Sequence, residues 1–156
     1  MKIFSIKNQK DFTGKLFTGD VFDSFLLVEA NFVKDHSIFI DGHYTGDEER
    51  NDEYVLWKDA KQLAFDTLKG SKLPKSFKIV LKLTKENAIN TQKSLELDVD
   101  SAAGFYLNIK YSDKAIICTT GTSTASFVIS RDLEKGWDGF AEKFLELKQI
   151  EFDKEM

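Results

Sequence analysis

Two histidines, one cysteine and two arginines are all that this chain of 156 residues has of the side chains that most often carry chemistry. His36 and His43 lie in one segment, and Cys118 stands alone in an apolar run. A thiolate zinc site needs several Cys or His ligands at fixed spacing, and a nucleophilic triad would have to recruit one of the two imidazoles. The nine glycines form no dinucleotide-binding or P-loop pattern. The sequence therefore contains no catalytic motif that spacing alone identifies.

Asp41 and His43 are the candidate pair for acid–base or metal chemistry. They are two residues apart, so on a strand their side chains share a face, and Asp47 or Glu48 from the following acidic loop is a conceivable third ligand. Two candidate ligands without a third at fixed spacing do not define a metal site, and we expect a surface pair that binds no metal. An enzyme would have to use Asp41, His43 and the carboxylate of Glu29 for proton transfer.

A cluster of hydroxyl side chains surrounds Gly121. Its hydroxyl and backbone N–H groups could bind an anion in a concave turn. The alternative is a simple β-turn between two Thr-rich strands, in which Gly121 takes the left-handed position. The second arrangement is the more common one for such a sequence. The ligand hypothesis concerns Thr120, Gly121, Thr122 and Ser123.

Six lysines and no acidic residue lie in the segment from Lys69 to Lys85. The simpler interpretation is a solvated surface, with lysines on the wet face of a strand. The alternative is an anion-binding patch that acts by long-range, salt-sensitive attraction. Two arginines in the whole chain argue against nucleic acid, because bidentate contacts to bases and phosphates come mainly from arginine. The patch comprises Lys69, Lys72, Lys75, Lys78, Lys82 and Lys85.

Three further side chains are expected to be structural. Cys118, between Ile117 and Thr119, is expected to be a small buried hydrophobe rather than a nucleophile. Trp57 and Trp137 are expected to anchor their helices in the core. An exposed tryptophan would instead mark a surface for a partner.

The composition indicates a soluble globular protein. Hydrophobic residues make up 42% of the chain and charged residues 31%, with fourteen phenylalanines, so enough apolar surface exists to offset chain entropy. We expect one domain over residues 1–156 with an ordered core over about residues 1–150. No apolar run approaches the roughly 20 residues of a membrane span. A single cysteine without an export signal is typical of the cytoplasm.

The N-terminal pattern predicts a strand over residues 2–6 followed by a helix. Asn8 and Asp11 form a capping pair at the start of that helix, and Gly19 ends it. Its buried stripe is expected to be Phe12, Leu16 and Phe17.

A β-hairpin is predicted over residues 25–33 and 38–40. Strict alternation places Leu26, Val28, Ala30 and Phe32 on one face of its first strand. The acidic loop over residues 46–53 then leads to a helix that Asn51 or Asp52 caps and that runs to Lys69.

The second half of the chain is predicted to contain several strands and two helices. Residues 77–83 alternate most clearly, and Phe77, Ile79, Leu81 and Leu83 are expected to face inward. Thr84 caps a weaker helix to about Lys93, residues 95–99 form an edge strand, and a three-strand meander follows over residues 105–111, 115–120 and 125–129. Ser130 caps the last helix, whose apolar stripe comprises Leu133, Trp137, Phe140, Phe144 and Leu147.

Short connections between strands, without strict strand–helix alternation, indicate an α+β fold. We expect a single domain with a mainly antiparallel sheet of about six to seven strands and three to four helices packed on it.

Several segments resemble one family. They are residues 22–30, Ile40-Asp41-Gly42, Trp57-Lys58-Asp59, residues 105–124, Trp137-Asp138 and residues 142–145. The chain is similar, from Met1 to about Ile150, to a family of short bacterial, clostridial proteins that is defined only as a domain of unknown function. The resemblance implies a single-domain cytoplasmic protein. It implies no activity, cofactor or catalytic residue.

The missing catalytic motif and the large aromatic content favour a non-enzymatic binding or protein-interaction domain. Two alternatives remain open. One is an enzyme of unfamiliar type that uses Asp41, His43 and Glu29. The other is a nucleic-acid-associated module, like one repeat of a sliding clamp, that uses the stretch from Lys69 to Lys85. We expect no cofactor and no membrane contact, and the sequence determines neither the partner nor the oligomeric state.

Overall fold

One antiparallel sheet organises the molecule. The computed structural model describes residues 1–70, 73–124 and 131–155. Within these residues eight strands pair in the order β3-β2-β5-β6-β7-β1-β8, and β4 pairs with β2. The strands are β1 (Ile3–Ile6), β2 (Leu26–Val33), β3 (Ser37–Asp41), β4 (Val55–Leu56), β5 (Ser76–Lys82), β6 (Gly104–Ser112), β7 (Ala115–Ser123) and β8 (Phe152–Glu155).

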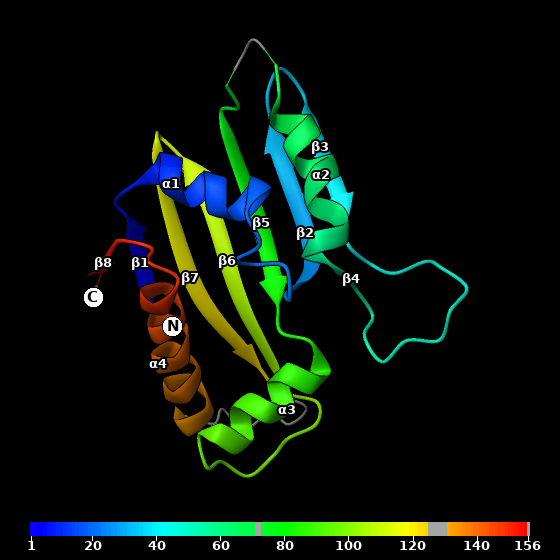
Figure 1. Cartoon of the computed structure of the whole chain (residues 1–156), viewed down its shortest axis with the longest axis vertical. Coiled ribbons are helices and arrows are strands. Elements are labelled where there is room, and N and C mark those ends of the chain that lie inside the picture. The colour runs from blue at the N-terminus through cyan, green and yellow to red at the C-terminus, as the bar shows by residue number, and fades with distance from the viewer. Residues whose placement is uncertain (71–72, 125–130, 156) are drawn as a thin grey trace.

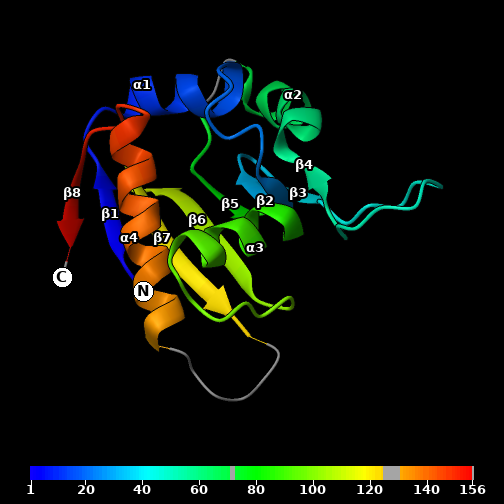
Figure 2. The same cartoon turned by 60° about the horizontal axis from the view of Figure 1, so that its bottom comes forward.

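The helices lie over one face of this sheet (Figures 1 and 2). The predicted α+β fold is confirmed, with one strand more than expected. The helices are α1 (Gln9–Thr13), its π-helical continuation η1 (Gly14–Thr18), α2 (Trp57–Leu68), α3 (Lys85–Ser94) and α4 (Arg131–Leu147).

Two of the predicted helix caps form as expected. The Asn8 side chain accepts a hydrogen bond from the backbone N–H of Asp11 at 3.1 Å, and Thr84 accepts one from Asn87 at 3.1 Å. Each bond satisfies a backbone donor that the first turn of a helix leaves free. The caps locate the starts of α1 and α3 because they depend only on neighbouring residues.

The predicted cap of α2 is wrong. The helix begins at Trp57, after Leu56, which provides no side-chain cap. Asp52 accepts instead from the backbone N–H of Lys85 at 2.9 Å, so the acidic loop is tied to the start of α3. A polar residue near a helix start is a cap only where the chain enters the helix directly, and here β4 lies between them.

The central strand β5 confirms the predicted register. Phe77, Ile79 and Leu81 are buried on the helix-covered face and pair with Tyr111, Ile109 and Leu107 of β6. Lys78 is exposed on the open face, where it lies opposite Lys110. Leu83, just after the strand, is buried as expected.

The predicted faces of β2 are wrong in its first half. The pairing of β2 with β5 shifts between Leu27 and Glu29, which marks a β-bulge. The extra residue reverses the alternation. Leu27, rather than Val28, therefore joins Ala30 and Phe32 in the core.

Residues 95–99 do not form the predicted edge strand. The backbone N–H of Leu97 donates to Gln92 O at 3.0 Å, and the Gln92 side chain bonds to both backbone groups of Asp100. These bonds fold the segment back against α3, and Leu97 packs on the core. The segment therefore makes local hydrogen bonds with α3 instead of the strand pairing that its alternating sequence predicted.

The meander differs from the prediction at its second turn. Residues 121–123 continue β7 and pair with β6, so the predicted turn is wrong. The predicted third strand over residues 125–129 and the Ser130 cap lie outside the described residues. An unexpected strand, β8, pairs with β1 at the far edge.

The stripe predicted for α4 is largely confirmed. Leu133 and Trp137 are buried, and Phe140 and Phe144 pack against the core. The prediction that Leu147 belongs to this stripe is wrong, because Leu147 lies in the last turn of α4 and is 80% exposed.

Candidate functional site

A pocket of about 600 Å³ lies on the helix-covered side of the sheet, between the α1–η1 segment and α2. Its floor comes from β5, β6 and β7, and the segment that precedes β5 borders it as well. The volume is within the range of about 300–1,000 Å³ typical of small-molecule sites. We call it the α1–α2 pocket. Its lining residues are Gln9, Lys10, Thr13, Gly14, Phe17, Thr18, Phe65, Leu68, Leu73, Pro74, Phe77, Tyr111 and Ile116.

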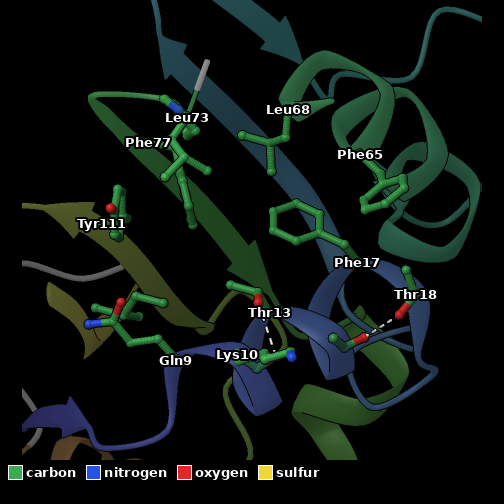
Figure 3. A pocket seen from close by; sticks show the side chains of 13 residues that line it. Gln9, Lys10, Thr13, Phe17, Thr18, Phe65, Leu68, Leu73, Phe77 and Tyr111 are labelled. Carbon is green, nitrogen blue, oxygen red and sulfur yellow. Dashed lines mark hydrogen bonds between the residues drawn. The ribbon is translucent and has the colours of Figure 1, made fainter. Parts of the chain in front are cut away.

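Aromatic rings form much of the wall. The ring centroid of Phe17 lies 6.4 Å from that of Phe65 and 5.9 Å from that of Phe77, while Phe77 stacks on Tyr111 at 5.4 Å. Figure 3 shows Phe17, Leu68 and Phe77 around a common space, with Gln9 and Lys10 at the α1 side. The interior is therefore apolar, and the polar side chains come mainly from one helix.

The walls are held in place near the start of α2. Trp57 is fully buried, and its indole N–H donates to Leu16 O at 2.8 Å. Lys61 Nζ bonds to Gly19 O and to Asp23 Oδ1, each at 2.7 Å. These contacts join α2 to the end of η1 by bonds that do not use the pocket itself. The space between the helices is thus bordered by fixed elements.

Gly14 is the first residue of η1 and part of the pocket wall. Its carbonyl accepts from Gly19 N at 2.7 Å and from the Thr18 hydroxyl at 2.8 Å, which gives the π-helical turn. Its φ of −61° is ordinary for any residue. A Cβ added at Gly14 would meet no atom within 4 Å. The glycine therefore leaves open space that a larger side chain would occupy.

Most polar side chains in the wall are already used within the protein. Gln9 Nε2 donates to Lys114 O at 2.6 Å, and the hydroxyls of Thr13 and Thr18 donate to the carbonyls of Lys10 and Gly14. The ammonium of Lys10 is exposed and has no carboxylate partner among the described residues. It is the one charged group in the described lining.

The predicted acid–base residues lie elsewhere, at the β2–β3 edge. Glu29 and Asp41 are opposite each other in the ladder, and Asp41 Oδ1 accepts from the backbone N–H of His43 at 2.9 Å. The exposed His43 ring packs edge-on against Tyr54 at 5.7 Å. The structure thus brings Glu29, Asp41 and His43 to one edge, and their catalytic role stays a prediction. Within the described residues, no group of three or more His, Cys, Asp or Glu side chains has the arrangement of a metal site.

The hydroxyl cluster lies in strand β7 rather than in a turn. Thr120, Gly121, Thr122 and Ser123 pair in register with residues 104–107 of β6. Thr120 is buried, and its hydroxyl donates to Asp138 of α4 while it accepts from Lys2 N at 2.8 Å. The anion hypothesis rested on a concave turn, and it stays a prediction without that support.

The predicted lysine patch is divided among several surfaces. Lys69 follows α2, Lys75 precedes β5, and Lys85 begins α3. Lys78 and Lys82 share the open face of β5, where Lys82 Nζ lies 5.7 Å from the Tyr54 ring centroid and 5.5 Å from that of Tyr106. Lys72 lies outside the described residues. Anion binding by this patch stays a prediction.

The structural side chains behave as expected. Cys118 is buried, and burial raises the pKa of its thiol far above the ordinary value, so the thiolate does not form near neutral pH. Trp57 and Trp137 are buried in the core.

Sequence patterns missed the pocket because it requires segments that are distant in the chain. Phe17 was predicted to be core, but nothing local indicated that Phe65, Leu73 and Tyr111 would lie near it. The one available signal was Gly14, a glycine inside a predicted helix with no capping role.

The chain belongs to a family of unknown function, DUF5721, whose model matches residues 15–153. That range begins within η1 and includes most of the pocket wall. No curated protein and no solved structure matches the chain. Among the described residues, no helix has the length and apolarity needed to cross a membrane.

Proposed function

We propose that this member of the DUF5721 family is a non-catalytic binding domain that holds a small apolar ligand in the α1–α2 pocket. The observation that carries the proposal is the concave wall of Phe17, Phe65, Leu68 and Phe77. Sites for small molecules are typically concave and mostly apolar, with a few polar groups that orient the ligand. We expect the domain to act in the cytoplasm, since its one cysteine is typical of reducing compartments.

Binding without catalysis is favoured by where the acid–base candidates lie. Glu29, Asp41 and His43 are at the β2–β3 edge and do not line the pocket. The described lining offers no carboxylate, imidazole or thiol for proton transfer or nucleophilic attack. This lining favours a ligand that is bound and released unchanged.

The proposal is tested with N-phenylnaphthylamine, a neutral dye whose fluorescence rises in apolar surroundings. The wild-type protein should bind it with saturation at one site. Gly14→Leu should abolish the signal, because the added side chain enters the space that Gly14 leaves open. Gly139→Leu is the matched control, since it also adds a side chain where a Cβ meets no atom within 4 Å, but on α4.

Loss of dye binding in Gly14→Leu alone supports the α1–α2 pocket. Saturable binding that survives in Gly14→Leu would place the ligand elsewhere. Absence of saturable binding in the wild-type protein would contradict the proposed function. Thermal unfolding of both variants verifies that each is folded.

A further inference from the structure

We infer that the ligand of the α1–α2 pocket is an amphipathic anion, with an aliphatic or aromatic body in the pocket and a carboxylate head against the ammonium of Lys10. This inference rests on the proposed function and adds the chemical class of the ligand. It comes from the distribution of unused polar groups around the pocket.

The interior selects the body of the ligand. Phe17 and Phe77 are almost fully buried, and Ile116 is 1% exposed, so the deep side of the pocket presents hydrocarbon. Leu73, at the segment before β5, is 86% exposed and also lines the pocket. A solvent-exposed leucine beside a concave apolar surface gains most from a ligand that covers it.

Lys10 selects the head of the ligand. It is the one charged residue of the described lining, and its neighbour Asp11 is already paired with Lys15 at 2.8 Å. On the other wall, Lys69 Nζ lies 4.7 Å from the centre of the Phe65 ring, but Asp66 balances its charge at 3.6 Å. Among the described lining residues, the uncompensated charge is therefore positive and belongs to Lys10, which favours a negative head group.

The neutral polar groups do not offer an equivalent partner. Gln9, Thr13 and Thr18 already donate to backbone carbonyls. The Tyr111 hydroxyl makes no hydrogen bond with described residues, but Tyr111 is uncharged and its ring is stacked on Phe77. Tyr111 can add a donor, whereas Lys10 is the one described lining residue whose charge distinguishes an anion from an alcohol of the same length.

The experiment compares decanoate with decanol by isothermal titration calorimetry at low ionic strength and pH 7. Both have the same hydrocarbon body, and only the first is anionic. Decanoate should bind about fivefold more tightly, because an exposed charge pair contributes up to about 1 kcal/mol. Lys10→Met should remove the preference and leave the affinity for decanol unchanged.

Two further variants locate the effect. Lys114→Met removes a charge from a residue that does not line the pocket but whose backbone carbonyl accepts from Gln9, and Tyr111→Phe removes a hydroxyl without changing the charge. Both should keep the preference for decanoate. If either abolished it while Lys10→Met did not, the assignment of the head group to Lys10 would be overturned.

Failure of this inference is distinguishable from failure of the proposed function. Equal affinity of the wild-type protein for decanoate and decanol would overturn the anionic head and leave the apolar pocket standing. Absence of binding by both, together with absence of dye binding, would contradict the pocket itself. A dimer that forms with rising protein concentration in size-exclusion chromatography, and that Gly14→Leu disrupts, would show a second copy of the chain as the occupant.

Discussion

The helices pack on the sheet at two places, and the packing is complete at one of them and leaves a pocket at the other. Helix α4 runs across β1 and β7. Its Trp137 is 1% exposed and reaches β6, where its indole N–H donates to Tyr106 O at 2.9 Å. We call this contact the α4 seam. The α1–η1 segment and α2 lie over the other part of the sheet, where α2 packs against β2 (Figure 1). Between them the α1–α2 pocket stays open above β5, β6 and β7.

Polar groups show the same difference. In the α4 seam the amino group of Met1 pairs with Glu134, and Lys2 and Lys154 both pair with Glu142, at 3.5 and 2.8 Å. In the α1–α2 pocket the ammonium of Lys10 has no carboxylate partner among the described residues. The pairs at the seam link α4 to β8 and to the residues at the start of the chain, whereas the charge of Lys10 is the one that the proposed ligand would use.

The lengths of the covering elements explain the contrast. α4 has 17 residues and spans its strip of sheet with one continuous apolar stripe. α1 has five residues and η1 another five, and the second wall comes from a helix more than thirty residues further along the chain. The α1–η1 segment and α2 come from distant parts of the chain and leave a gap between them, whereas α4 is one continuous helix. Whether the sheet is fully covered therefore depends on how many separate segments lie over it.

The largest expected effect is at the α4 seam. Trp137→Ala should lower the free energy of unfolding by about 3–5 kcal/mol, because it removes a fully buried indole and leaves a cavity. Urea denaturation followed by circular dichroism measures the change. Leu147→Ala, at an 80% exposed position of the same helix, should change the midpoint little. Similar midpoints for the two variants would mean that Trp137 is not tightly packed between α4 and the sheet.

A smaller loss is expected at the α1–α2 pocket. Leu68→Ala should lower the free energy of unfolding by about 1 kcal/mol, because Leu68 is half-buried and already borders open space. The same urea titration gives the value. A loss as large as that of Trp137→Ala would show that the pocket is packed as tightly as the seam.

Two glycines of α4 provide a sharper test of packing. Gly139→Ala should raise the free energy of unfolding by about 0.5–1 kcal/mol, because alanine is the better helix former and a Cβ there meets no atom within 4 Å. At Gly136 the added Cβ would lie 2.8 Å from Leu95 Cδ1. Gly136→Ala should therefore stabilise less than Gly139→Ala, and the reverse order would contradict the described contact with Leu95.

The smallest effect is the pH dependence of the Met1–Glu134 pair. The hydrogen bond to Glu134 raises the pKa of the Met1 amino group above 8.0, and the same bond lowers the pKa of Glu134 below 4.5. Stability from the amine is present below pH 8.0 and is lost as the pH rises through its raised pKa. Stability from the carboxylate is present above pH 4.5 and is lost as the pH falls through its lowered pKa.

Glu134→Gln should therefore lower the melting temperature most between about pH 5 and pH 8, and less in stronger acid or alkali. The difference should be small, because both groups are largely solvated. Glu49→Gln, at an exposed loop position, serves as the control and should show no such profile. A difference that is constant from pH 4 to pH 10 would contradict the pairing.

Local chemistry determined much of the fold in advance. Asn8 and Thr84 start their helices because a cap bonds to a backbone N–H three residues later. The alternation of Phe77, Ile79 and Leu81 predicted the buried face of β5, since a strand buried on one side repeats every two residues. Each of these patterns is complete within one short segment, so it can be recognised before the rest of the chain is placed.

Only the tertiary structure decided the rest. The bulge between Leu27 and Glu29 arises from the way β2 pairs with β5, which is distant in the chain. Residues 152–155 form strand β8 because they can pair with the edge of β1. The candidate site belongs to this class, because Lys10, Phe65 and Tyr111 come from three elements with no common sequence pattern. A pocket is the space that several packed segments fail to fill, and that space exists only after the sheet has brought them together.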